Sequence, residues 1–275
     1  PFSFGQRMIR RSPDDTNTPE LARHGKTTVG PEDDRRRRFL LRVPFHRINK
    51  YRFFGHFYIT GMVFSSPLLT YVHVYDDATH AVAVALLYTH LSRRLYESYR
   101  VNQPGGSTVT LAGYVLGNLH YVFLPFVFLP IRSDDSDPQK QNPPAFWIGL
   151  TVVMNLASQC YQHIYHKKLA DLRECKNGKK YSVPRGMLFD YVSCPHYLLE
   201  ICIYISFFVL LMLTEFCASF KFSLKLSTVV RSAPLALLVW VVVNLSVNAR
   251  QTHIWYRQNF QHYPQDRKAL VPFLW

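Results

Sequence analysis

The sequence has 275 residues, of which 48% are hydrophobic and 15% aromatic, and its formal net charge is +14. These averages look ordinary for a soluble protein, but basic residues gather at the N-terminus whereas several later runs are almost free of charge. This segregation excludes a single water-soluble domain and is typical of a polytopic membrane protein. The high pI, about 9.7, is better explained by loops beside anionic lipid headgroups or by an anionic cofactor than by nucleic acid.

The first predicted element is a polar N-terminal segment. Residues 1–52 form a basic, poorly ordered cytosolic segment in this prediction, and residues 1–30 lack the apolar core of a cleavable signal peptide. A membrane-embedded domain, 53–275, follows. A membrane helix needs about 20 apolar residues. We therefore predict an all-α, polytopic transmembrane helical bundle of about six spans, at 53–73, 79–92, 109–131, 145–161, 195–216 and 232–249.

The distribution of positive charge orients this bundle. Of the 32 Lys and Arg, 13 lie in 1–52, 3 in 93–109, 7 in 162–194 and 4 in 249–275, which are alternate loops. Cytosolic loops carry the excess of Lys and Arg. Both termini and the long 162–194 loop are therefore predicted to be cytosolic.

No metal or nucleotide motif stands out in the sequence. The five cysteines form no CxxC pair, and the histidines show no HExxH spacing. His163 and His166 are three residues apart, which alone is a weak indication of a metal ligand pair. No metal site is predicted, and neither a GxGxxG turn after a strand nor a P-loop is present.

The first polar cluster is "YTHLSRRLYES" at 88–98, beside a predicted membrane span. On a helix, His90, Arg94 and Glu97 share one face. Two interpretations stand: a neutralised ion pair that ends a span, or an enclosed Glu97 that donates a proton. The second interpretation requires burial to raise the pKa of Glu97.

Two further clusters surround the 162–194 loop. Gln162, His166 and Arg173 fall within about 40° of one another around a helix, and Arg173 suits bidentate contact with phosphate. Basic residues also accumulate at any cytosolic helix end, so spacing alone does not decide between a phosphate-binding site and an ordinary helix end. His196 and Glu200 then share a face of the helix that Pro195 opens, where packing and chemistry are equally good explanations.

The last cluster lies in the final span. Asn244 and Asn248 are one turn apart and either hold helices together or, with Trp255 and Tyr256, line a pocket for a planar ring. From the residues alone, a membrane enzyme and a transporter are about equally supported, although the chain lacks the paired, interrupted spans typical of transporters.

Several longer motifs carry a family resemblance: "YSVPRGMLFDYVSCPHYLLEI", "FQHYPQDRKALVPFLW", "SRRLYES" and QxxxHxxxxxxLR at 162–173. With these motifs the sequence resembles the steroid 5α-reductase family, within it the polyprenol reductase branch, over most of 21–275. The part from about 120 to 275 resembles the 3-oxo-5-alpha-steroid 4-dehydrogenase domain. The family begins with a further transmembrane helix, so the chain is expected to lack the family's first span.

The resemblance implies NADPH as cofactor, held without a Rossmann domain and entering from the cytosol, in a multi-pass protein of the endoplasmic reticulum membrane. Glu97 would then face the substrate as the catalytic acid. The positions that match cofactor contacts are Gln162, His166, Arg173, Tyr181, His196, Glu200, Asn244, Asn248 and Tyr256. His196 and Ser182 replace the Asn and Arg usual in steroid reductases, so phosphate contacts are expected at Lys179, Lys180 or Arg185.

The expected function is reduction of the α-isoprene double bond of polyprenol or polyprenal, giving dolichol or dolichal for dolichol-phosphate synthesis and protein N-glycosylation. We favour the aldehyde as immediate substrate, because its carbonyl can hold the charge that hydride addition creates. The alternatives are a 3-oxo-5α-steroid 4-dehydrogenase, a very-long-chain trans-2-enoyl-CoA reductase and, outside the enzymes, a transporter. The expected partners are a polyprenyl lipid and membrane lipid, without nucleic acid or an obligate protein partner.

Overall fold

The computed structural model describes residues 50–75, 78–101, 111–129, 144–174, 182–216 and 226–272. Over these ranges the chain forms six α-helices, and its only β-type pairing is one isolated bridge. The helices are α2 (Lys50–Tyr75), α3 (Ala78–Tyr96), α4 (Leu111–Val127), α5 (Ala145–Glu174), α6 (Pro195–Phe216) and α7 (Leu226–Asn259). The predicted all-α membrane fold is confirmed, with one helix for each predicted span. Most of the predicted N-terminal segment lies outside the described residues.

The two longest helices exceed the apolar runs that predicted them. At 1.5 Å per residue, the 30 residues of α5 and the 34 of α7 extend about 45–50 Å, whereas a hydrocarbon core is about 30 Å thick. By length and hydropathy, Pro195–Leu213 and Ser232–Asn259 are candidate membrane spans among the described residues. The excess length places the polar end of α5 beyond its apolar run, where the second polar cluster lies.

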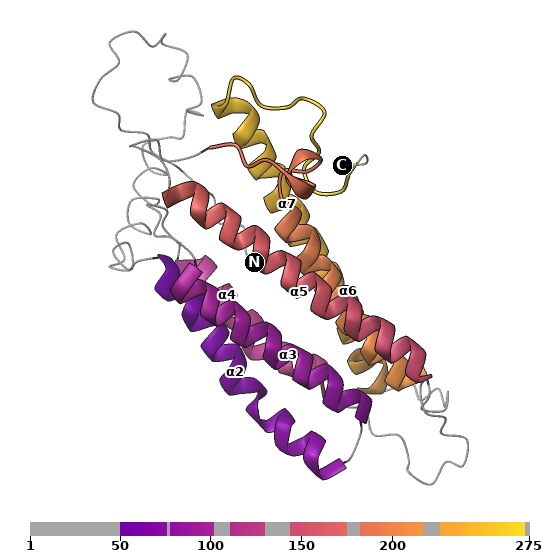
Figure 1. The fold of residues 1–275 in the computed structure, drawn as a ribbon. Helices are drawn as coiled ribbons and strands as arrows, with labels where there is room; N and C mark the ends of the chain where they lie inside the picture. The colour runs from indigo at the N-terminus through magenta and orange to yellow at the C-terminus, as the bar shows by residue number, and fades with distance from the viewer. Residues whose placement is uncertain are drawn as a thin grey trace.

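The helices lie alongside one another in an elongated bundle (Figure 1). Helix α2 packs along α3 and α4, α5 packs along α6, and α6 packs along α7. Helix α3 connects the two groups through its contacts with α5 and α6. Figure 1 also shows that the segment before α6 and the C-terminal segment meet at one end of the bundle.

Glycines allow the first three helices to approach closely. A Cβ added at Gly117 on α4 would lie 2.6 Å from the Phe57 ring on α2, and one added at Gly61 would lie 2.9 Å from the Tyr121 ring. Small residues at helix interfaces let backbones come together in membrane proteins. This packing stacks Phe57 on Tyr121 and buries Tyr58 between α2 and α4.

The segment before α6 fixes where that helix begins. Gly186 takes a positive φ of 85°, which glycine adopts without steric cost, and a 3₁₀ turn, η4 (Met187–Asp190), follows. The Gly186 N–H donates to the Asp190 carboxylate at 2.8 Å. Val192 then forms the isolated parallel bridge with Lys268 of the C-terminal segment. Helix α6 starts at Pro195, so His196 and Glu200 lie in its first two turns.

Candidate functional site

Glu97 is the centre of a cluster of charged and hydrogen-bonding side chains. It is completely buried at the point where α3 passes into a short π-helix, η3 (Glu97–Val101). Its Oε1 accepts from Arg93 Nη1 at 2.5 Å and from His163 Nδ1 at 2.9 Å. Its Oε2 accepts from Arg94 Nη1 at 2.6 Å and from His166 Nδ1 at 2.7 Å. Each carboxylate oxygen therefore has one guanidinium and one imidazole donor.

This environment keeps Glu97 ionised. Burial opposes ionisation, but the His166 hydrogen bond and the charges of Arg94, His166 and Arg93 together hold the pKa of Glu97 well below its usual range. The raised pKa predicted for a proton-donating Glu97 is therefore wrong. The sequence pattern could not indicate this, because two of the four donors come from α5, far along the chain.

The same environment keeps His166 neutral. Burial, followed by the positive charge of Arg94, lowers the pKa of His166 to about 4. A neutral imidazole at pH 7 has one ring N–H. Because an ionised carboxylate only accepts, the 2.7 Å bond to Glu97 requires that N–H on Nδ1, and the same Nδ1 lies 2.8 Å from Arg94 Nη1.

Gln162 connects this cluster to Glu200 on α6. Its Oε1 accepts from Arg93 Nη2 at 2.5 Å, and its Nε2 donates to the Glu200 carboxylate and, at 3.0 Å, to the His196 carbonyl. The other oxygen of Glu200 lies 3.4 Å from His90 Nε2. Two carboxylates and two guanidiniums are thus joined through one amide. We call this set the polar network: His90, Arg93, Arg94, Glu97, Gln162, His163, His166 and Glu200.

The polar network unites three of the four clusters seen in the sequence. The predicted shared face of His90, Arg94 and Glu97 divides in the folded chain, since His90 lies toward Glu200 and Arg94 toward Glu97. The predicted grouping of Gln162 with His166 is present. His196 contributes its carbonyl, and its ring lies 5.5 Å from that of His166.

The fourth cluster has its own contacts on α7. Asn248 Nδ2 donates to the Asn244 carbonyl at 2.8 Å and lies 3.2 Å from Asn244 Oδ1. Tyr256 stacks in parallel on Tyr263, with ring centroids 5.4 Å apart. The side chain of Arg173 and the whole of Tyr181 lie outside the described residues.

Sequence reasoning missed two members of the network. Arg93 is four residues before Glu97, an i, i+4 spacing that favours an ion pair and was available as a signal. His163 was considered only as a weak metal ligand, and it instead hydrogen-bonds Glu97. Over the part of the chain that the structure describes, no group of three or more His, Cys, Asp or Glu could hold a metal ion.

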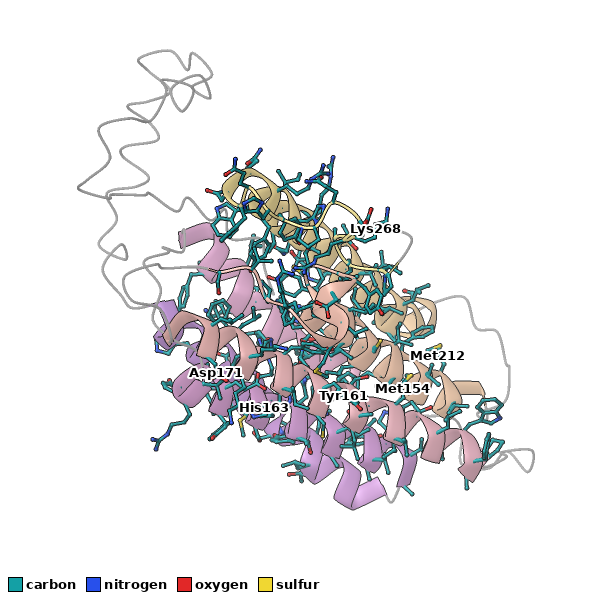
Figure 2. The ribbon with its side chains drawn as sticks, turned by 45° about the horizontal axis from the view of Figure 1, so that its top comes forward. Met154, Tyr161, His163, Asp171, Met212 and Lys268 are labelled. Atoms are coloured by element: carbon teal, nitrogen blue, oxygen red, sulfur yellow. The ribbon has the colours of Figure 1, made fainter. Side chains whose placement is uncertain are left out.

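A polar ladder continues from the network along α5 toward its apolar end. Arg93 Nε lies 3.4 Å from Gln159 Oε1, Gln159 donates to Asn155 at 2.6 Å, and Asn155 donates to Ser206 on α6 at 2.5 Å. Figure 2 marks the course of α5 by Met154, Tyr161, His163 and Asp171. The ladder satisfies buried polar groups within the bundle, so α5 and α6 are held together by hydrogen bonds as well as by apolar packing.

Comparison with known proteins gives a family and several relatives. Residues 109–275 match the family described as 3-oxo-5-alpha-steroid 4-dehydrogenase. The polyprenal reductase of Caenorhabditis elegans is 29% identical, over 72% of this chain and 61% of its own length. The polyprenal reductase of Saccharomyces cerevisiae is 29% identical over 93% of this chain and 86% of its own length.

A plant relative is equally similar. Polyprenal reductase 1 of Arabidopsis thaliana is 28% identical over 82% of this chain and 81% of its own length. The chain spans about three fifths of the length of the nematode and rice relatives that it matches. The family match includes α5, α6 and α7, so Gln162, His166 and Glu200 lie inside it, whereas Glu97 precedes it.

Proposed function

Because the chain belongs to the 3-oxo-5-alpha-steroid 4-dehydrogenase family, we propose that it is an NADPH-dependent reductase of the α-isoprene double bond of polyprenal. The observation that carries the proposal is the polar network, which joins α3, α5 and α6 at the polar ends of their apolar runs. The names of the nematode, yeast and plant relatives support the polyprenyl aldehyde as substrate. The product would be the saturated aldehyde required for dolichol synthesis and protein N-glycosylation.

An amide of the fourth cluster suits a nicotinamide dinucleotide. Asn244 Nδ2 is buried and has no acceptor among the described residues, while its Oδ1 is held by Asn248. A fixed, unsatisfied amide N–H is what a carboxamide or phosphate oxygen would require. The cofactor would supply a hydride when bound. Its proposed contacts are Gln162, His166, Arg173, Tyr181, His196, Glu200, Asn244, Asn248 and Tyr256.

Positive charge near the start of α6 suits the cofactor's phosphates. Lys168 Nζ lies so near Gly186 that a Cβ added there would be 2.9 Å away, and Lys167 and Arg185 are exposed on the same elements. By the distribution of Lys and Arg, this end of the bundle would face the cytosol. We accordingly propose a cytosol-facing cofactor site, in the endoplasmic reticulum membrane, within the domain 53–275.

The aldehyde is the chemically competent substrate. Hydride addition to an isolated allylic alcohol leaves negative charge that no group can hold, whereas an α,β-unsaturated aldehyde delocalises this charge onto its oxygen. A buried donor at that oxygen is typically worth about 3–4 kcal/mol. Ionised Glu97 has no proton to donate, so we assign it the role of fixing Arg93 and Arg94 close to the reaction.

The test is turnover by the purified, detergent-solubilised chain with NADPH and either polyprenal or polyprenol. We expect NADPH oxidation and a saturated aldehyde with polyprenal, and no reduction of the alcohol unless it is oxidised first. Glu200→Gln should weaken NADPH binding, measured by nicotinamide fluorescence. Asp171→Asn, an exposed carboxylate on α5, is the matched control and should behave as the wild type.

Competing substrates decide between the proposal and its alternatives. A 3-oxo-4-ene steroid and a trans-2-enoyl-CoA should each give a lower kcat/KM than polyprenal. A higher kcat/KM for the steroid or for the enoyl-CoA would show that this compound, and not polyprenal, is the preferred substrate. No NADPH binding and no reduction of any of the three would refute the reductase proposal and favour the transporter.

A further inference from the structure

Reduction of an enal requires a proton as well as a hydride, and Glu97 cannot provide it. Both of its oxygens accept from cations and imidazoles, and the group is ionised. Its four donors also fill the positions through which a substrate oxygen could reach it. A buried O–H group beside the polar network must therefore be sought among other side chains.

Tyr58 on α2 is such a group. It is only 4% exposed, and the Arg94 guanidinium carbon lies 5.3 Å from the centroid of its ring. Tyr58 therefore lies against a guanidinium of the polar network. We propose that Tyr58 donates the proton to the carbonyl oxygen of the polyprenyl aldehyde; this inference rests on the function proposed above.

Two other tyrosines nearby use their hydroxyls for contacts within the bundle. The Tyr88 hydroxyl donates to the Met62 carbonyl at 3.0 Å, and the Tyr204 hydroxyl lies 3.5 Å from His120 Nε2. Tyr121 packs edge-on against Tyr58, with centroids 5.4 Å apart. Of these four rings, that of Tyr58 is the one beneath the Arg94 guanidinium.

The proposed step balances in atoms and charge. A bound reduced nicotinamide would supply the hydride to the β-carbon of the enal, and the π electrons would move to the carbonyl oxygen. The Tyr58 O–H bond breaks as the new O–H bond of the enol forms, which leaves a phenolate beside Arg94. The enol tautomerises to the saturated aldehyde, and water returns one proton to the phenolate.

Arg94 gives Glu97 a defined place in this step. Arg94 Nη1 donates to Glu97 Oε2 at 2.6 Å, so the carboxylate holds the guanidinium over the Tyr58 ring. A cation at this position stabilises the phenolate that forms. Glu97 is therefore a positioning residue that acts through Arg94, and Tyr58 is the group that touches the substrate.

The first experiment compares Tyr58→Phe with Tyr88→Phe in the full chain. Each variant loses one tyrosine hydroxyl, but the half-buried Tyr88 hydroxyl donates only to the Met62 carbonyl of α2. Loss of the proton donor should lower kcat on polyprenal by a factor on the order of 10² to 10⁴, with NADPH binding unchanged. Tyr88→Phe should keep wild-type kcat. If Tyr58→Phe keeps wild-type kcat while the wild type is active, this inference fails and the proposed function stands.

A second readout needs no turnover. The aldehyde that is saturated at its α-isoprene unit has no activated double bond to reduce, and its carbonyl stretch falls in frequency when it accepts a hydrogen bond. Infrared difference spectra should show this lowered frequency with the wild type and Tyr88→Phe, but not with Tyr58→Phe. An equal shift in all three proteins would overturn the assignment of Tyr58.

A third variant covers the case in which Tyr58→Phe does not fold. Difluorotyrosine introduced at position 58 keeps the ring and the hydroxyl but makes the phenol more acidic. The alkaline limb of the kcat profile should then move to lower pH. An unmoved limb in a folded, active protein would contradict proton donation by Tyr58. Failure of the wild type to reduce polyprenal would instead refute the proposed function.

Discussion

Two regions of the molecule join distant parts of the chain by different means. The polar network connects α3, α5 and α6 through two guanidiniums and two carboxylates. A second region, which we call the C-terminal anchor, connects the segment before α6 to the C-terminal segment and contains no carboxylate. Its members are Ser193, His253, Tyr263 and Arg267, with the backbone of Pro184 and Lys268.

Ser193 is the centre of the C-terminal anchor. Its hydroxyl lies 2.6 Å from the Tyr263 hydroxyl and 2.7 Å from His253 Nδ1, and it donates to the Lys268 carbonyl at 3.0 Å. The backbone repeats the connection, since the Ser193 N–H donates to the same carbonyl at 2.8 Å. Figure 2 shows Lys268 on the C-terminal segment, apart from Met154 and Met212 on α5 and α6.

This difference in charge predicts how much stability each region loses when one of its side chains is changed. Removing one partner of a buried ion pair leaves an uncompensated charge, which costs far more than the pair contributes. Removing one partner of a neutral hydrogen bond costs the desolvation of a single polar group. The polar network should therefore be sensitive to charge and pH, and the C-terminal anchor should lose stability in smaller steps.

Glu97→Gln should have the largest effect. The amide keeps the size of the side chain but removes the nearest counter-charge of Arg93 and Arg94, so we expect a loss of about 3–5 kcal/mol in the free energy of unfolding. Thermal unfolding of the detergent-solubilised protein measures it. Asp171→Asn makes the same charge change at an exposed position and should unfold as the wild type does. Equal midpoints for the two variants would show that the network adds no stability.

Acid should weaken the polar network through His166. Its pKa is about 4 in the folded protein and about 6.5 when unfolded, so the unfolded chain binds the extra proton first as pH falls. His166 therefore contributes fully to the free energy of unfolding above pH 6.5. This contribution declines as the pH falls toward 4, by up to about 3 kcal/mol. The lowered pKa of Glu97 keeps its own contribution intact over this range.

Unfolding midpoints between pH 7.5 and 4.5 test this dependence. His166→Gln should flatten the decline, and the difference between the two curves isolates His166 from the other histidines. Parallel curves for the wild type and the variant would contradict the assignment of a neutral, buried His166.

Arg267→Met should have an intermediate effect on the C-terminal anchor. Arg267 is 3% exposed, donates to the Pro184 carbonyl at 3.1 Å and covers the Tyr263 ring at 4.9 Å. Methionine fills part of the volume but leaves the carbonyl unsatisfied, which costs about 1–3 kcal/mol. Lys268→Met removes a neighbouring exposed cation and should leave the unfolding midpoint unchanged. If the stability lost in Arg267→Met depended on pH, the C-terminal anchor would not differ from the polar network in the way expected here.

Much of the fold could be predicted from the sequence. Five of the six apolar runs have about 17 to 23 residues, and each of the six corresponds to one helix, because a bilayer span requires about 20 apolar residues whatever the helix packs against. The ends of α5 and α7 extended beyond the prediction, since hydropathy reports the apolar part of a helix and not its polar continuation. Pro195 correctly marked the start of α6.

Less of the candidate site could be predicted. Helical spacing placed His196 with Glu200 and Gln162 with His166, but it carries no information about which faces meet. The ionised state of Glu97 depends in part on His166, more than 60 residues away. Tyr58 gave no sequence signal, because a tyrosine in an apolar run looks like packing until Arg94 is found above its ring.

Ser193→Ala should have the smallest effect of the four changes. It removes the shared hydroxyl and leaves the Tyr263 hydroxyl short of one partner, but the Ser193 N–H still donates to the Lys268 carbonyl, and Lys268 N–H to the Tyr191 carbonyl. We expect a loss of about 1 kcal/mol in the free energy of unfolding. Ser92→Ala, at an exposed position of α3, should lose nothing. A loss as large as that of Glu97→Gln would mean that the side chain of Ser193, and not the paired backbone, holds the C-terminal segment in place.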